Sequence, residues 1–438
     1  FRRLLIPGGI ALASDTIGFI TILLIDIQVI QEMAITASLG VAAIILTNLI
    51  LLPVLVSYLH LSVAYREKLQ KRSRQLAPIW RVITRASESK PAAVVILISV
   101  GLLVVGAWKG AGIKIGDVHQ GVPELRSDSR YNIDSAVISE HFSIGVDVMS
   151  VIVETVEEGC IDYDVMSTID RFAWHMENVE GVQSVVSLTT VAKVVNSGWN
   201  EGGLEWRVLS RNRSVLGQSV AYVPTSSGLL NEDCSVMPVM MFTTDHKAET
   251  IARIVSEVKR FAQANESETI KFRLATGNVG VMAATNEVVK ATQFPILLGV
   301  FSAIMVLCLI TFRSIRAVLC IVIPLALVSL LAYALMAVLE IGLKVSTLPI
   351  VALGVGIGVD YGIYIYSRFQ SLLAEGKSIP DAYLITLAIT GNGVVFTGLT
   401  LAIGVGAWIF SPLKFQADMG ILLTFMFLVN MLGAILLL

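Results

Sequence analysis

The chain has 438 residues, of which 55% are hydrophobic and 15% are charged, and its formal net charge is −2. Soluble domains carry about 25% charged residues, so the composition excludes an ordinary soluble protein and predicts an integral membrane protein. The sequence has no nucleic-acid motif and no basic patch with interleaved aromatic residues, which argues against a nucleic-acid-binding function.

The two ends of the chain indicate a piece of a longer protein. The sequence begins at Phe1 rather than at a methionine, and it ends inside an apolar run at Leu438. We therefore expect a fragment. The first apolar run is a full-length span without a small-residue cleavage site, so we do not predict a signal peptide.

Eight apolar runs each come near the roughly 20 residues that cross the hydrocarbon core of a bilayer. They lie at 4–25, 34–57, 92–108, 293–312, 317–338, 346–366, 388–410 and 416–438. The first two resemble the last two in a weak internal repeat that aligns Gly18 with Gly404 and Met33 with Met419. Such duplication is common in transporters. We interpret 1–57 as the last two helices of a first repeat and 293–438 as the five spans of a second.

Basic residues in short loops predict the orientation, because such residues stay on the cytoplasmic side. The connection 58–91 is rich in them: Arg66, Lys68, Lys71, Arg72, Arg74, Arg81, Arg85 and Lys90. Two later loops carry Arg313, Arg316, Arg368 and Lys377. Counting the spans between these loops places all of the loops on the same side of the membrane. We predict that 58–91 is cytoplasmic and that 109–290 is periplasmic or extracellular.

The segment 109–290 is long and polar enough to form a soluble domain. Its sequence predicts strands at 148–154, 182–188, 236–244 and 270–275 and helices at 164–179 and 247–264. Residues 189–232 are predicted to form short helices and loops between the two halves. Two β-α-β units with an insertion indicate an α+β, ferredoxin-like domain. A further helix, 278–293, leads directly into a membrane span, either as a coupling element or as a passive linker.

The four cysteines divide into two pairs. Cys160 and Cys234 lie in the predicted extracytoplasmic domain, where disulfides form and persist. We predict a disulfide between them, with two free buried thiols as the alternative. Cys308 and Cys320 lie in or at the edge of membrane spans and are interpreted as small packing residues.

Asp360 is the most informative residue, because it lies at the centre of an apolar span in the run Gly-Val-Gly-Ile-Gly-Val-Asp-Tyr. A carboxylate in that position costs roughly 2.5–3.5 kcal/mol on insertion scales, so proton or ion handling is the first hypothesis. A solvated carboxylate in a polar crevice is the alternative. Tyr361 can donate a hydrogen bond to a carboxylate one residue away or on a partner helix.

The span of Asp360 has two faces that need protein rather than lipid. Three glycines at four-residue spacing form a ridge that lets a neighbouring helix approach: Gly354, Gly358 and Gly362. Asp360 lies on a different face, together with Gly356 and Tyr364. This pattern predicts that the helix lies inside the bundle.

Three further residues are candidates for a proton path with Asp360. Asp15 is a second intramembrane carboxylate, in the run Ala-Ser-Asp-Thr; it joins a relay or anchors packing through Ser14 and Thr16. Thr397 and Thr400 share one face of the seventh span. They line a path near Asp360, or they bond to carbonyls of their own helix as membrane threonines commonly do.

The sequence carries no constellation for catalysis. Its five histidines have no metal-ligand spacing, so no metal site is expected. It has no Gly-x4-Gly-Lys-Ser/Thr phosphate loop and no arguable Ser-His-Asp arrangement. We expect no cofactor and no enzymatic activity.

These residues resemble the resistance-nodulation-division (RND) superfamily. The resemblance rests on Phe312-Arg-Ser-Ile-Arg316, Pro324 and the Gly-rich run that ends in Asp360-Tyr361, and its closest branch is the MmpL-type and predicted lipid exporters, related to Patched and other sterol-sensing-domain proteins. It implies twelve membrane helices in two repeats and two extracytoplasmic porter domains. This chain then corresponds to helices five to twelve, with 109–290 as the second porter domain.

The resemblance also implies a function. Family relays use Asp-Tyr pairs on helices four and ten; Asp360 and Tyr361 match the second pair, and the first lies outside this chain. The implied activity is proton-driven export of lipids or other hydrophobic or amphiphilic molecules from the bacterial inner membrane, with a homo-oligomer or a periplasmic partner. A lipid- or sterol-sensing receptor and an accessory subunit of protein translocation are the alternatives.

Overall fold

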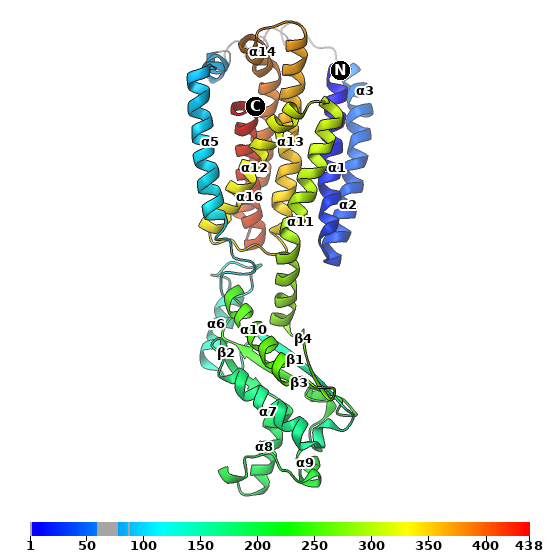
Figure 1. Cartoon of the computed structure of the whole chain (residues 1–438), viewed down its shortest axis with the longest axis vertical. Helices are drawn as coiled ribbons and strands as arrows, with labels where there is room; N and C mark the ends of the chain where they lie inside the picture. Colours follow the sequence, from blue (N-terminus) through cyan, green and yellow to red (C-terminus); the bar gives the residue numbers. More distant parts are fainter. Residues whose placement is uncertain (1, 59–77, 86–87) are drawn as a thin grey trace. The chain divides into compact units, whose positions relative to one another are not determined.

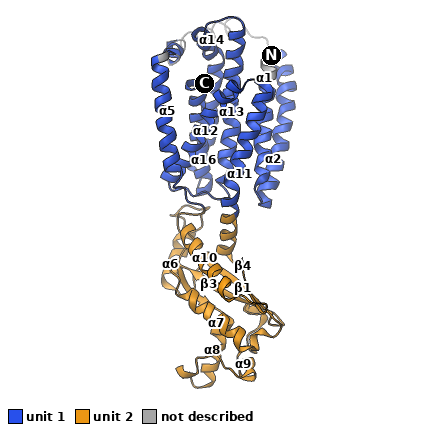
Figure 2. Ribbon diagram, in the orientation of Figure 1, with its two compact units in different colours: residues 1–115, 288–438 blue, residues 116–287 orange. Residues whose placement is uncertain are grey.

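The computed structural model describes residues 2–58, 78–85 and 88–438. The chain forms two compact units (Figure 2): unit 1 comprises Phe1–Ile115 and Val288–Leu438, and unit 2 comprises Gly116–Glu287. The soluble segment that we predicted at 109–290 corresponds to unit 2. Some of the basic residues used to predict orientation lie outside the described residues: Arg66, Lys68, Lys71, Arg72 and Arg74.

Unit 1 is a bundle of apolar helices (Figure 1). In the described part of the chain, seven helices are long and apolar enough to cross a membrane, and the first predicted span coincides with a shorter apolar helix, Gly8–Leu24. The prediction of a polytopic helical membrane protein is confirmed. The elements are α1 (Arg2–Thr21), α2 (Gln28–Leu46), α3 (Leu52–Ser57), α5 (Ser89–Gly110), α11 (Asn278–Phe312), α12 (Ile315–Val338), α13 (Leu348–Ala374), α14 (Ile379–Thr386), α15 (Asn392–Gly406) and α16 (Lys414–Leu436).

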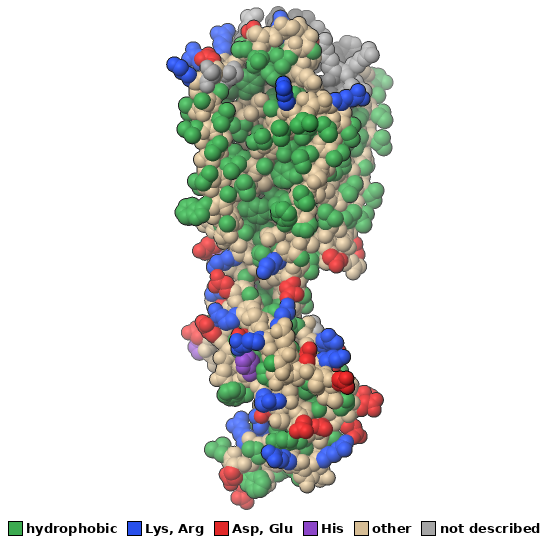
Figure 3. Space-filling view, viewed as in Figure 1, with side chains coloured by type: hydrophobic (Ala, Val, Ile, Leu, Met, Phe, Trp, Pro, Cys, Tyr) green, Lys and Arg blue, Asp and Glu red, His purple; other side chains and the backbone are tan. Residues whose placement is uncertain are grey.

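Two of the spans contain a single π-helical turn. The turn Thr47–Leu51 joins α2 to α3, and Leu387–Gly391 joins α14 to α15. Each pair therefore forms one continuous span, Gln28–Ser57 and Ile379–Phe410. Figure 3 shows that hydrophobic side chains cover most of the visible face of unit 1, whereas charged side chains gather at its ends and over unit 2.

Unit 2 contains a four-stranded antiparallel sheet in the order β2-β3-β1-β4. Its strands are β1 (Val148–Thr155), β2 (Val182–Val186), β3 (Val236–Thr243) and β4 (Ile270–Thr276). Its helices are α6 (Arg130–His141), α7 (Tyr163–Glu177), α8 (Leu188–Trp199), α9 (Arg213–Val220) and α10 (Ala248–Asn265). With α7 after β1 and α10 after β3, this is the β-α-β-β-α-β order of a ferredoxin-like fold, as predicted.

The apolar faces of α7 and α10 form the core of unit 2 against the sheet. Phe172 on α7 contacts Phe261 on α10 and Phe272 on β4, with ring centroids 5.1 and 4.9 Å apart. Asp162 begins α7 by accepting hydrogen bonds from two backbone N–H groups of its first turn. The first backbone N–H groups of a helix have no partner within the helix, and this capping carboxylate accepts hydrogen bonds from two of them. The cap explains why α7 begins directly after Asp162.

A disulfide links the insertion to the first β-α connection. Cys160 follows β1, Cys234 precedes β3, and the two are joined across a separation of 74 residues. The insertion between them contains α8 and α9. Cys308 is buried in α11 and Cys320 is exposed on α12, and both are free.

Helix α11 is continuous from Asn278 to Phe312, a length of 35 residues. The boundary between the two units falls inside it, between Glu287 and Val288. The helix that we predicted at 278–293 and the span that follows it are therefore one element. Pro295 lies within it without ending it.

The glycine ridge of α13 contacts two different helices. A Cβ built on Gly354 would lie 2.3 Å from Met426 Cε, and one on Gly358 would lie 2.4 Å from Asn430 Nδ2, both on α16. A Cβ on Gly362 would instead lie 3.1 Å from Ile321 on α12. Asn430 is buried and donates a hydrogen bond to the carbonyl of Gly354 at 2.9 Å. Asn430 can make this contact because Gly358 has no side chain to obstruct it.

We expect loss of the disulfide to destabilise unit 2. A loop of 74 residues is worth about 4 kcal/mol in the chain-entropy description. Replacement of Cys160 and Cys234 by serine should lower the melting temperature of this unit by roughly 10 °C. Thermal unfolding of the purified chain in detergent measures this, with Cys320→Ser as the control. Equal melting temperatures would show that the bridge contributes nothing.

We expect Gly358→Ala to lower the stability of unit 1 by about 1–3 kcal/mol, the usual cost of overpacking. The new methyl group would force Asn430 away from the carbonyl of Gly354. Gly393→Ala is the matched control, because no heavy atom lies within 4 Å of a Cβ built there. Asn430→Ala in the Gly358→Ala background should restore part of the loss. A neutral Gly358→Ala in thermal unfolding would contradict this packing.

Candidate functional site

The candidate site lies where α13 crosses α1. The face of α13 that carries Asp360 packs against α1, and the closest approach is between two glycines. A Cβ built on Gly18 would lie 3.7 Å from the Cα of Gly356. Two helices can approach this closely only where both present small residues. The crossing therefore brings the polar run of α1 directly against Asp360.

Ser14 is the hydrogen-bond partner of Asp360. Its Oγ lies 3.0 Å from Asp360 Oδ1 and 2.6 Å from the carbonyl oxygen of Ala11. The Ser14 side chain is completely buried. A hydroxyl can donate one proton and also accept one. Ser14 can thus donate to an ionised Asp360, or accept from a protonated Asp360 while it donates to Ala11.

Asp15 adds a second carboxylate to the crossing. It interacts electrostatically with Asp360, and its Oδ1 is buried without a hydrogen-bond partner in the described chain. Two ionised carboxylates in an apolar surrounding repel each other, and one proton held by the pair removes one charge. The structure thus brings Asp15 and Asp360 into one site.

Tyr361 does not make the hydrogen bond to a carboxylate that the sequence allows. Tyr361 is only 2% exposed, and it belongs to a buried cluster that includes Trp80 and Tyr383. Its hydroxyl is buried without a hydrogen-bond partner among the described residues. The reason is helical geometry, because adjacent residues point about 100° apart. Ser14, rather than Tyr361, is the hydrogen-bond partner of Asp360.

Tyr364 lies on the same face of α13 as Asp360. Its hydroxyl oxygen would lie 3.3 Å from a Cβ built on Gly8 of α1. Gly356, Asp360 and Tyr364 therefore oppose Gly18, Ser14 and Gly8 in turn along the crossing. This order is what two antiparallel helices in direct contact require.

Thr397 and Thr400 do not lie beside Asp360 in this chain. Both are exposed on α15, and Thr400 donates a hydrogen bond to the carbonyl of Phe396 on its own helix at 2.7 Å. The buried face of α15 carries Gly398, which packs against Met431 of α16. Of the two alternatives for these threonines, a path near Asp360 and bonding to their own helix, the hydrogen bond of Thr400 fits the second.

Sequence reasoning missed the direct contact between Ser14 and Asp360. The two residues are 346 positions apart, and Ser14 was considered only as a packing residue next to Asp15. The polar run Ala-Ser-Asp-Thr within an apolar span was the available signal. Asn430 was missed altogether, although an asparagine in the last span is also unusual. Among the described residues, no group of three or more His, Cys, Asp or Glu side chains could hold a metal ion.

The comparisons with known proteins agree with the sequence resemblance. The MMPL family matches residues 135–438. A membrane protein of Methanocaldococcus jannaschii, MJ1562, is 22% identical over 263 residues, which cover 59% of this chain and 65% of that protein. A membrane protein of Streptomyces coelicolor, SCO6666, is 36% identical over 89 residues, or 20% of this chain and 12% of that protein.

A solved structure shares the fold of the whole chain. The cryo-EM structure of the hedgehog release protein Disp from the water bear Hypsibius dujardini matches with a TM-score of 0.57 at 13% identity. The match covers 98% of this chain and 57% of that one. The chain thus spans about two thirds or less of the relatives that it matches. Because one family pattern extends over 135–438, from α6 of unit 2 to the last helix of unit 1, this chain belongs to the MMPL family.

Proposed function

We propose that the full-length protein is a proton-driven exporter of lipids or other hydrophobic or amphiphilic molecules. The observation that carries the proposal is the Asp360–Ser14 contact at the crossing of α13 and α1, with Asp15 beside it. Intramembrane carboxylates that face a bundle interior are typical of proton pathways. The fold shared with a hedgehog release protein supports outward transfer of a bulky cargo.

The energy available from protons fits such a task. One proton that crosses a potential of 100 mV supplies about 2.3 kcal/mol. Each pH unit of gradient adds about 1.4 kcal/mol. One or two protons per cycle would therefore move an amphiphile against a concentration ratio of ten or more. Asp360 would take up and release the proton, and Ser14 would change between donor and acceptor.

We further propose a bacterial inner-membrane location with unit 2 on the periplasmic side. The basic loops of the sequence support this orientation. The disulfide between Cys160 and Cys234 lies in unit 2, and disulfides persist in oxidising compartments. A homo-oligomer or a periplasmic partner would complete the export path.

The first test is cargo efflux in cells that carry the full-length protein, with and without a protonophore. We expect Asp360→Asn to reduce efflux to background at unchanged abundance, because an amide cannot carry a proton through the cycle. The matched control is Asp26→Asn, which changes an exposed carboxylate of the same unit. Efflux that survives both Asp360→Asn and the protonophore would favour a lipid-sensing receptor instead.

A second test addresses Ser14. Hydrogen bonds to charged groups are worth about 1.5–3 kcal/mol, so Ser14→Ala should lower the efflux rate about tenfold or more. Thr16→Val is its control, because the Thr16 hydroxyl bonds to the carbonyl of Leu12 on its own helix. If Ser14→Ala and Thr16→Val export equally at equal abundance, Ser14 is a packing residue.

A further inference from the structure

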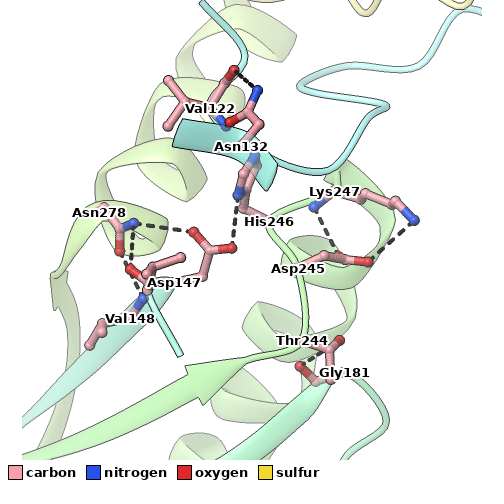
Figure 4. A network of polar contacts seen from close by, with 11 residues as sticks. Val122, Asn132, Asp147, Val148, Gly181, Thr244, Asp245, His246, Lys247 and Asn278 are labelled. Carbon is pink, nitrogen blue, oxygen red and sulfur yellow. Dashed lines mark hydrogen bonds and ion pairs between the residues drawn. The ribbon is translucent and has the colours of Figure 1, made fainter. Parts of the chain in front are cut away.

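A network of polar contacts in unit 2 holds the first residue of α11 (Figure 4), with Asp147 and His246 buried and Asn278 exposed. It joins three segments that are far apart in the sequence: Asp147 before β1, His246 between β3 and α10, and Asn278 at the start of α11. We call these three residues the α11 latch. None of them belongs to the site around Asp360.

Asn278 ties the start of α11 to the beginning of β1. Its Oδ1 accepts a hydrogen bond from Val148 N at 2.8 Å, and its Nδ2 lies 3.2 Å from Val146 O and 3.3 Å from Asp147 Oδ1. The preceding residue, Gly277, has φ +87°, and a Cβ there would lie 2.3 Å from Val148 O. The turn that leads into α11 therefore packs directly against the start of β1.

His246 supplies the charge partner of Asp147. Its Nδ1 lies 3.0 Å from Asp147 Oδ2, and the residues are 3% and 9% exposed. The second ring nitrogen, Nε2, is also buried. His246 and Asp147 line a cavity of about 480 Å³, together with Glu140 and Asp245. A proton or a water molecule can therefore reach the pair through this cavity.

The charges around His246 favour its protonated ring. Burial alone would lower the pKa of His246, but the hydrogen bond and charge of Asp147, the carbonyl of Gly121 and the charge of Asp117 outweigh it. The pKa of His246 therefore lies above its ordinary value of 6.5. Glu140 of α6 adds a further carboxylate to the cavity wall.

Asp245 does not compete with Asp147 as the charge partner of the His246 ring. Burial alone would raise the pKa of Asp245, but hydrogen bonds from Thr250 and Lys247 and the charge of Lys247 outweigh it and lower that pKa. The Lys247 ammonium lies 3.4 Å from Asp245 Oδ2. Asp245 is thus matched by its own cation, and His246 is left as the charge partner of Asp147.

We propose that the α11 latch is a pH-responsive device, which fixes the start of α11 to β1 while His246 is protonated and loosens it when the ring becomes neutral. Loss of the proton leaves the buried Asp147 carboxylate without a counter-charge, and an unpaired buried charge is costly. Water from the cavity then competes with Asn278 for Asp147 Oδ1. Because α11 continues past Glu287 into unit 1, the latch acts on an element that both units share.

The sign of the pH dependence follows from the raised pKa. The stabilisation is fully present below the ordinary histidine pKa of 6.5. It is lost as the pH rises through the higher pKa of the folded protein. The latch is therefore closed in mildly acidic solution and open in alkaline solution.

The test is hydrogen–deuterium exchange of the whole chain in detergent from pH 6 to 9, with exchange times scaled for the intrinsic pH dependence of amide exchange. We expect protection of the amides at 277–283 to fall several-fold with rising pH in the wild type, relative to the middle of α11. His246→Gln and Asp147→Asn should abolish that dependence. His175→Gln is the matched control, because His175 pairs with Glu257 elsewhere in unit 2 at 3.2 Å, and it should respond as the wild type does.

Three outcomes would overturn the latch. One is a wild-type protection that does not change with pH; this result needs no variant and so does not depend on how any variant folds. Another is a wild-type response retained by either His246→Gln or Asp147→Asn. The third concerns Asn278→Ala, which leaves the ionisable pair intact and should show low protection at every pH; wild-type protection in this variant would also refute the proposal.

Discussion

A carboxylate inside an apolar helix bundle must be surrounded by protein, and the structure of unit 1 around α13 follows from this constraint. Lipid offers no hydrogen bond to Asp360, so a neighbouring helix has to supply one. Ser14 of α1 does so, from 346 residues away. This contact requires the two helices to approach closely, which Gly18 and Gly356 permit. The polar site and the small residues are therefore parts of one arrangement.

The other faces of α13 complete the same arrangement. Gly354 admits Met426 of α16, Gly358 admits Asn430 of the same helix, and Gly362 admits Ile321 of α12. Tyr361 lies on a third side, in a buried cluster that includes Trp80 and Tyr383. A helix enclosed on so many sides holds Asp360 at a fixed position relative to Ser14. Such rigidity suits the proton exchange at a defined place that we propose for Asp360.

Unit 2 contains the α11 latch, for which we propose a dependence on charge. Its ferredoxin-like sheet places the start of β1, the end of β3 and the start of α11 together at one end of the two central strands. Asp147, His246 and Asn278 meet there because the strand order makes these three segments neighbours. The two sites thus rest on different chemistry. The Asp360 site consists of carboxylates in an apolar helix bundle, whereas the α11 latch contains a buried ion pair in unit 2.

The sequence alone determined the class of protein, most of the spans, the strand and helix order of unit 2 and the importance of Asp360. These features follow from hydrophobic runs and periodicity, which are local in the chain. The partners of Asp360 and His246 were decided only by the tertiary structure. Ser14 reaches Asp360 through the packing of two distant helices, Tyr361 points elsewhere and Thr400 turns outward. Helix rotation and crossing depend on side chains that meet across the fold, and no local pattern encodes them.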